Sequence, residues 1–290
     1  MSALNVGVVG LGYWGPNLVR VLHELPTASI TKACDLDPAR RSRIESRYPG
    51  VRVTAEYDEL LHDNSVHAIA IATSVTTHFS LAMAALRAGK HVFVEKPMAS
   101  SVREAEEMEA FAAESGLTLM PGHTFLYSPA VNLVRDLITG GELGEIYFIS
   151  TSRVNLGLHQ SDVSVIWDLG PHDFSILRYW IGDSPSHVSA VSRACILEGT
   201  ADVAFVNAAY DSGTLAHVEM SWLAPSKLRR TAVVGSEKMV VYDDTSSEPV
   251  RVFDSGVSLP EPQTFGEYRF DLSHGRHRLS GYGSSRAACT

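Results

Sequence analysis

The fold is decided by the stretch Val6-Gly7-Val8-Val9-Gly10-Leu11-Gly12-Tyr13-Trp14-Gly15-Pro16-Asn17, close to the N-terminus. Small and β-branched residues, typical of a buried strand, end in three glycines, and apolar residues then recur at helical spacing. A strand, a Gly-x-Gly-x-x-Gly turn and a helix form the pattern that binds a dinucleotide. Gly10 permits the tight turn, Gly12 lets the backbone approach a pyrophosphate, and Gly15 lets helix and strand pack closely. The helix N-terminus adds N–H donors and partial positive charge for the anion.

A carboxylate follows the next predicted strand, residues 28–34. Asp35 lies about 20 residues beyond Gly15, where a carboxylate accepts hydrogen bonds from the adenosine ribose hydroxyls. An ionised acid there repels a 2′-phosphate, so NAD is favoured over NADP as the cofactor. The alternative is that Asp35 only begins the turn that Asp37-Pro38 continues. Arg40 is close enough in sequence to weaken the preference for NAD.

Composition sets broad limits on function. A chain of 290 residues, 45% hydrophobic and 20% charged, is typical of a globular protein of roughly two domains. The net charge of −9 and the pI near 5.7 argue against nucleic acid as the main partner, because no basic footprint is present. A local basic pocket for an anionic substrate stays possible on such a protein.

Cysteine spacing and hydropathy predict a cytoplasmic protein. Cys34, Cys195 and Cys289 show neither metal-ligand spacing nor a disulfide pattern, which is typical of a reducing compartment. A strand is predicted within a few residues of Met1, so we expect no signal peptide. No apolar run approaches the length of a membrane span, so we expect no membrane partner and, from the residue spacing, no metal site.

Strand and helix patterns alternate through residues 1–121, which predicts a doubly wound parallel sheet. Ligands of such sheets bind at the carboxyl ends of the strands. Thr73 and Ser74 follow the predicted strand 66–72, and Glu95-Lys96-Pro97 follows the predicted strand 91–94. Lys96 can therefore point a cation into the ligand crevice, although most lysines are solvated surface residues. The isomer of the Lys96–Pro97 peptide stays open.

Two motifs together resemble the Gfo/Idh/MocA family of oxidoreductases: Gly10-Leu11-Gly12-Tyr13-Trp14-Gly15 and Glu95-Lys96-Pro97-Met98-Ala99. The resemblance runs from Val6 to about Asp254. It implies a Rossmann domain followed by an α+β domain with a large, open, mainly antiparallel sheet, whose exposed face commonly mediates dimers or tetramers. It also implies that Lys96 touches the substrate and the nicotinamide ribose. The residues that we predict to bind NAD are Gly10, Gly12, Tyr13, Trp14, Gly15, Asp35, Thr73, Ser74, His78, Glu95 and Lys96.

The second domain is predicted over residues 122–264, with an atypical tail over 265–290. A helix is expected at 125–138 and a strand at 146–154, followed by a polar loop at 155–165. Further strands are predicted at 188–194, 202–210, 214–222, 231–234, 238–242 and 250–253. Runs of strands after few helices fit a separate α+β layer.

Asp168 and His172 are four residues apart at the start of a predicted helix, so they share one face. Histidine is the usual general base for removing an alcohol proton as hydride leaves carbon, and a carboxylate can orient its ring. The alternative is that Asp168 caps the helix and His172 is a buried, hydrogen-bonded histidine. The residues alone leave these interpretations balanced. The resemblance favours catalysis, because the family's Asp-x-x-x-His motif falls on these residues and joins Lys96 in the site.

Three further segments resemble a branch of the family that acts on nucleotide sugars, the UDP-N-acetylglucosaminuronate 3-dehydrogenases. They are Gly122-His123-Thr124-Phe125, the segment from Trp167 to Asp173, and the segment from Ser221 to Arg229. The resemblance implies oxidation of the C3 hydroxyl of a UDP-N-acetyl-hexosamine or its uronate. His123 is a candidate for the pocket, and Arg153, Lys227 and Arg229 are candidates for carboxylate or diphosphate. Each charge taken singly is equally well explained as a surface residue.

The tail does not continue the resemblance. Residues 273–290 lack a periodic apolar pattern. With suitable synonymous codons, deleting one base at the Gly275/Arg276 junction gives a sequence similar to that of relatives. We therefore hypothesise a frameshifted, truncated C-terminus. The sequence as a whole predicts an NAD-dependent sugar dehydrogenase that forms a homo-oligomer. The alternatives are an inositol or free-sugar dehydrogenase, and a catalytically silent NAD-binding protein.

Overall fold

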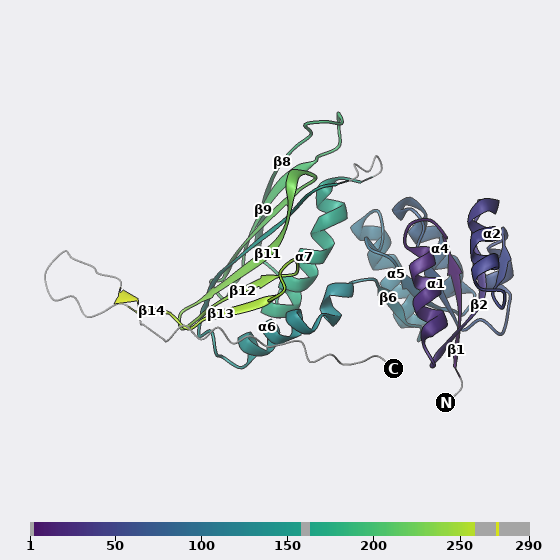
Figure 1. Ribbon diagram of the computed structural model, residues 1–290, viewed down its shortest axis with the longest axis horizontal. Coiled ribbons are helices and arrows are strands. Elements are labelled where there is room, and N and C mark those ends of the chain that lie inside the picture. The colour runs from purple at the N-terminus through teal and green to yellow at the C-terminus, as the bar shows by residue number, and fades with distance from the viewer. Residues whose placement is uncertain (1–2, 158–162, 259–270, 273–290) are drawn as a thin grey trace, which may run out of the picture. The chain divides into compact units, whose positions relative to one another are not determined.

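The computed structural model describes residues 3–157, 163–258 and 271–272. The chain divides into two units, Met1–His123 and Thr124–Thr290. The boundary predicted from sequence lies between residues 121 and 122. The first unit is a layer of parallel strands between helices, and the second is a larger sheet with two helices against it (Figure 1).

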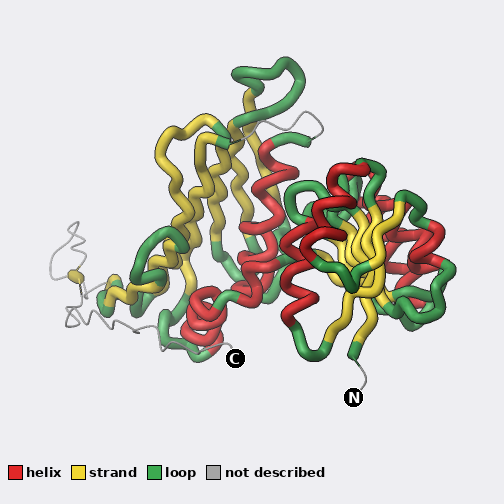
Figure 2. Tube along the Cα trace, turned by 45° about the vertical axis from the view of Figure 1, so that its right-hand side comes forward, coloured by secondary structure: helices red, strands yellow, loops and turns green. Residues whose placement is uncertain are grey.

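The first unit holds one six-stranded sheet. Its strands are β1 (Leu4–Val9), β2 (Ala28–Cys34), β3 (Arg52–Thr54), β4 (Ala68–Ile71), β5 (His91–Val94) and β6 (Leu119–Pro121). Its helices are α1 (Gly15–Glu24), α2 (Pro38–Arg47), α3 (Asp58–Leu61), α4 (Val75–Arg87) and α5 (Val102–Glu114). The strand order is β3-β2-β1-β4-β5-β6, and every neighbouring pair is parallel. Helices cover both faces (Figure 2). The predicted doubly wound sheet is confirmed.

Burial on both faces explains why the central strands are continuously apolar. Val8, Ile69 and Ile71 are fully buried, and two apolar clusters fill the spaces between the sheet and its helices. The strand order reverses between β1 and β4, so the crevice of the sheet opens at their carboxyl ends.

The second unit holds a seven-stranded sheet. Its strands are β7 (Ile146–Leu156), β8 (His187–Arg193), β9 (Val203–Ala209), β10 (Leu215–Ser221), β11 (Leu223–Gly235), β12 (Met239–Asp243) and β13 (Val250–Phe253). The order is β13-β12-β11-β7-β10-β9-β8; only β10 and β7 pair in parallel. The helical segments are η1 (Thr124–Tyr127), α6 (Pro129–Thr139) and α7 (Val165–Ile181). The predicted second sheet, mainly antiparallel, is confirmed.

Three elements of the second unit differ from the prediction by more than one residue. The expected helix at 125–138 is split into η1 and α6, because Pro129 begins a helix and holds Ser128 extended, with ψ of 128°. The strand expected at 231–234 begins earlier, at Leu223, and its register shifts between Leu223 and Leu228. The strand expected at 146–154 continues to Leu156, so the predicted loop begins later.

Most of the tail lies outside the described residues. Asp271–Leu272 forms β15, which pairs with β14 (Val257–Ser258), and the hypothesis of a frameshift concerns residues beyond it. Cys289 also lies outside the described part, whereas Cys34 and Cys195 are free thiols. None of the helices over the described ranges is long and apolar enough to cross a membrane.

Candidate functional site

Apart from His78, which lies on α4, the residues predicted to bind NAD follow the carboxyl ends of four neighbouring parallel strands. The glycine turn follows β1, Asp35 follows β2, Thr73 and Ser74 follow β4, and Glu95-Lys96 follows β5. Because these ends lie at one edge of the sheet, the structure brings the predicted residues of the first unit to one crevice.

The glycine turn has the shape that a pyrophosphate requires. Gly10 has a φ of +88°, and a Cβ there would lie 2.6 Å from the Ala72 carbonyl oxygen. A Cβ on Gly15 would overlap the Gly10 carbonyl, so both positions demand glycine. A Cβ on Gly12 would meet only the Arg40 guanidinium, at 3.4 Å, which leaves that backbone open to a ligand. Helix α1 begins at Gly15, so the positive end of its dipole lies at this turn, and these residues fit the dinucleotide.

The two aromatic side chains of the turn face solvent. Tyr13 is 82% exposed and Trp14 is 50% exposed, and their rings meet edge to face with centroids 5.7 Å apart. Their predicted contact with NAD stays a prediction.

Asp35 is anchored beside the glycine turn. Its Oδ2 accepts a 2.6 Å hydrogen bond from the Leu11 N–H, and its Oδ1 accepts a 2.8 Å bond from the Asp37 N–H. The carboxylate therefore orders the following turn, as the alternative interpretation expects, and its contact with the ribose stays a prediction. The Arg40 guanidinium lies 3.5 Å from Asp35 and 3.4 Å from Asp37, which places a cation beside the Asp35 carboxylate.

The buried ring of His78 links the loops that follow β4 and β5. Its Nδ1 lies 2.8 Å from the Pro97 carbonyl and its Nε2 lies 3.1 Å from the Thr73 carbonyl. Burial lowers its pKa, and a neutral ring donates to only one of these two oxygens. His78 thus ties the end of β4 to the turn that holds Lys96. Direct contact between His78 and NAD stays a prediction.

The turn after β5 holds Glu95 and Lys96 next to a cis Lys96–Pro97 peptide, the isomer that sequence left open. The Lys96 N–H donates to Glu95 Oε2 at 3.3 Å, and burial raises the pKa of the Glu95 carboxyl. Both side chains are half-buried.

His123 follows β6, and its N–H donates to the Pro121 carbonyl at 2.8 Å. Burial lowers the pKa of its ring. Its Nδ1 is buried and has no hydrogen-bond partner among the described residues, so it offers a polar atom to a ligand.

In the second unit, Asp168 and His172 lie on the first turns of α7. Ser164 is the N-cap, and its Oγ accepts from the Trp167 N–H at 3.5 Å. The alternative that Asp168 caps the helix is therefore wrong. Asp168 Oδ2 instead accepts a 3.1 Å hydrogen bond from the indole of Trp222. The half-buried ring of His172 meets the edge of the Phe125 ring, with centroids 4.9 Å apart.

The three predicted basic ligands differ in their surroundings. Lys227 is exposed on β11, and Arg229 pairs with Asp244 at 3.3 Å while staying 33% exposed. Arg153 is only 4% exposed, and two of its donors are held by Asp173. Binding of substrate by these three residues stays a prediction.

Sequence reasoning missed Asp173 and the aromatic neighbours of the site. Asp173 directly follows His172, and alternation along β7 places Arg153 on the same buried face as Ile149 and Thr151. A buried arginine requires an acidic partner, so this pattern was the available signal.

Family models match both units. A model described as oxidoreductase family, NAD-binding Rossmann fold, matches residues 4–123, and the GFO/IDH/MocA C-terminal domain model matches residues 131–241. The chain belongs to the Gfo/Idh/MocA family. It is therefore an NAD-binding oxidoreductase, and the predicted family and cofactor are confirmed.

Members of the family with several different activities are similar to the chain. It is 28% identical to the scyllo-inositol 2-dehydrogenase (NAD(+)) of Bacillus subtilis, over 92% of this chain and 83% of that protein. It is 27% identical to the UDP-N-acetylglucosamine 3-dehydrogenase of Acidithiobacillus ferrooxidans, over 84% and 75%. The crystal structure of GenD2 from gentamicin A biosynthesis in complex with NAD matches with a TM-score of 0.81 and 27% identity, over 92% and 77%. The chain spans between 61% and 75% of the length of several other curated relatives.

Proposed function

We propose that the protein is an NAD-dependent dehydrogenase that oxidises a secondary alcohol of a sugar, with a nucleotide sugar as the favoured substrate. The observation that carries the proposal is the shared face of α7, on which Asp168 is held by Trp222 and His172 follows one turn later. An imidazole and a carboxylate on one face supply the proton acceptor that alcohol oxidation needs.

The residues of this chain have distinct roles in the proposed reaction. The backbone from Gly10 to Gly15 and the N-terminus of α1 hold the pyrophosphate, and Asp35 holds the ribose. When bound, NAD supplies the acceptor for the hydride. His172 removes the hydroxyl proton, and the ammonium of Lys96 donates a hydrogen bond to the same oxygen as negative charge develops on it. Asp168 limits the orientation of the imidazole.

The favoured substrate class rests on the basic residues and on one group of relatives. Arg229 and Lys227 keep exposed cationic groups that suit a diphosphate or uronate, and His123 offers an unpaired ring nitrogen. The relative from Acidithiobacillus ferrooxidans is a UDP-N-acetylglucosamine 3-dehydrogenase. Oxidation at the sugar C3 position is part of this proposal. Asp35 supports NAD over NADP, and Arg40 beside it opposes that preference.

A second candidate function is oxidation of an inositol or a free sugar. It is favoured by the similarity to the scyllo-inositol 2-dehydrogenase of Bacillus subtilis, which covers more of the chain. The third candidate is an NAD-binding protein without turnover, and it is the outcome that the hypothesis of a truncated tail allows.

We further propose that two or more copies of the chain associate through the open face of the second sheet. Phe148, Phe205 and Leu215 each expose between 40% and 57% of their surface on the face opposite α7. Exposed apolar residues on an uncovered sheet are typical of an interface. A cytoplasmic location also stays a proposal, supported by the free thiols of Cys34 and Cys195.

The substrate proposal is tested by mixing the protein and NAD with UDP-N-acetyl-hexosamines, their uronates, inositols and free sugars, and recording NADH absorbance. Faster reduction with a UDP-sugar supports the proposal, and faster reduction with inositol or a free sugar supports the second candidate. Binding of NAD without reduction by any member of the panel identifies the silent protein. A parallel series with NADP measures the cofactor preference.

A further inference from the structure

We propose that Arg153 and Asp173 form a buried positioning pair that fixes the imidazole of His172, partly through the ring of Phe125. The proposal rests on the proposed role of His172 as the general base. It replaces a ligand role for Arg153 with a role inside the domain, and it assigns a function to Asp173.

The ion pair is buried and joined by two hydrogen bonds. Arg153 Nε donates to Asp173 Oδ2 at 2.6 Å and its Nη2 donates to Oδ1 at 3.1 Å, with the two side chains 5% and 3% exposed. The hydroxyl of Thr151 donates to the same carboxylate at 3.0 Å, and that of Thr231 donates to Thr151 at 3.0 Å. Two parallel bonds from a planar guanidinium fix direction as well as distance. These hydrogen bonds therefore attach α7, through Asp173, to strands β7 and β11.

The residue held by these hydrogen bonds is the neighbour of the proposed base. Asp173 directly follows His172 on α7, so the pair fixes the helix backbone from which the imidazole projects. A second contact reaches the ring itself. The Arg153 guanidinium carbon lies 4.7 Å from the centroid of the Phe125 ring, and the Phe125 ring meets the His172 ring at 75°.

Phe125 is thus held between a cation and an imidazole. The guanidinium is attracted to the negative face of the ring, and edge-to-face packing limits the rotation of His172. One arginine consequently constrains the base by two routes, through its backbone and through its side chain. A base held in one orientation transfers a proton more effectively than one that samples several, and small misplacements are costly.

The Arg153→Lys variant tests the positioning of His172 while keeping the buried positive charge. Lysine cannot form the two parallel hydrogen bonds to a carboxylate, and it has no planar group to stack on an aromatic ring. The His172 signal is followed by NMR of protein labelled at its histidine rings, and it is identified by its loss in His172→Gln. We expect Arg153→Lys to change the chemical shift of this signal. With the substrate found in the panel, we expect kcat to fall by about ten- to a hundredfold, while KM and NAD affinity change by less than about twofold.

Phe125→Leu is the second variant, and it alone decides the matter if Arg153→Lys does not fold. It keeps an apolar side chain but removes the ring contact, so it should move the His172 signal and lower kcat; Phe125→Tyr restores the ring and should restore both. Tyr179→Phe is the matched control. Tyr179 lies on α7 with His172, and its hydroxyl donates a 2.5 Å hydrogen bond to Asn132 on α6. The variant loses this bond, so it should lower stability but leave the His172 signal and kcat unchanged.

An unchanged His172 signal and kcat in folded Arg153→Lys or Phe125→Leu would overturn the proposal. An equal disturbance in Tyr179→Phe would do the same, because it would show a general effect of helix loosening. The NMR measurement needs no substrate. If the proposed function fails and no sugar is oxidised, the signal still decides whether the pair positions His172.

Discussion

The Glu95 side chain is a half-buried carboxyl group, and burial destabilises its charged form. Burial raises its pKa, and the nearby Lys96 opposes that shift only in part. The folded protein consequently binds the Glu95 proton more tightly than the unfolded chain does. The resulting stability is fully present below the ordinary pKa of 4.5 and is lost as pH rises through the folded pKa.

Glu95→Gln is therefore expected to raise the melting temperature at neutral pH in the absence of NAD. The advantage over wild type should shrink as pH falls toward 4.5, because both side chains are then uncharged. Thermal unfolding across this pH range measures the effect. Glu106→Gln, at an exposed position of α5, is the control. A constant difference between Glu95→Gln and wild type at every pH would contradict the assignment of burial as the cause.

At the scale of the element, the turn from β1 into α1 depends on backbone that only glycine adopts freely. Gly10→Ala should destabilise the protein by more than the roughly 1–2 kcal/mol that a positive φ costs an L-residue. The excess arises because the new Cβ would lie 2.6 Å from the Ala72 carbonyl oxygen. Urea unfolding measures the loss, and calorimetric titration should show that NAD affinity falls with it.

Gly89→Ala provides the comparison. Gly89 also has a positive φ, of +73°, but nothing lies within 4 Å of the added Cβ. This variant should lose only the cost of the backbone conformation and should bind NAD as wild type does. Equal losses of stability and affinity in both variants would show that the close approach at Gly10 does not matter.

The sequence predicted those elements that are determined by a local pattern of residues. Apolar runs and the glycine turn located the parallel strands, and the spacing of Asp168 and His172 placed them on one helix face. The split at Pro129 followed a local rule that the apolar periodicity obscured. The bond from Trp222 to Asp168 joins residues 54 positions apart, and the pair of Arg153 and Asp173 joins residues 20 apart. Such contacts depend on strand register and on which face a helix covers. Alternation along β7 indicated that Arg153 needs an acidic partner, but no local pattern specified which one.

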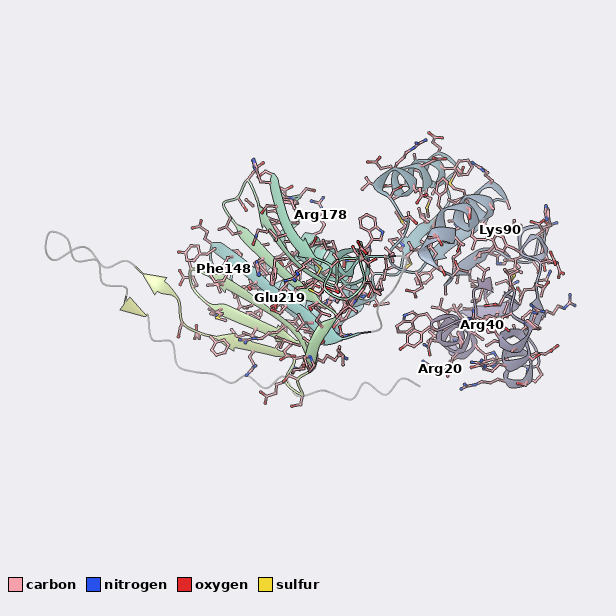
Figure 3. The ribbon with its side chains drawn as sticks, turned by 90° about the horizontal axis from the view of Figure 1, so that it is seen from above. Arg20, Arg40, Lys90, Phe148, Arg178 and Glu219 are labelled. Carbon is pink, nitrogen blue, oxygen red and sulfur yellow. The ribbon has the colours of Figure 1, made fainter. Side chains whose placement is uncertain are left out.

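At the scale of the whole molecule, the second sheet has one covered face and one open face. Helices α6 and α7 pack on the first, where Ile149, Val218 and Trp180 join one apolar core. Phe148 and Glu219 belong to neighbouring strands of this sheet (Figure 3). Glu219 accepts a 2.7 Å hydrogen bond from Ser152, so the open face mixes polar pairs with exposed aromatic rings. This mixture is typical of an interface between copies that fold separately.

Phe148→Glu is expected to weaken association of the chain, because it places a carboxylate among apolar residues of the open face. Light scattering coupled to gel filtration should show a multiple of the chain mass for wild type and a lower mass for the variant. Val102→Glu, at a 65% exposed apolar residue of the first unit, should leave the mass unchanged. A wild-type protein of single-chain mass at all concentrations would contradict the proposed assembly.

The measurement that tests the central claim most directly is NADH formation by wild type and His172→Gln, with the most active sugar of the panel and with NAD affinity determined in parallel. General base catalysis is worth roughly 10²–10⁴-fold, so turnover in His172→Gln should fall by about that factor while NAD binds as tightly as in wild type. A His172→Gln variant that reduces NAD at the wild-type rate would contradict the account.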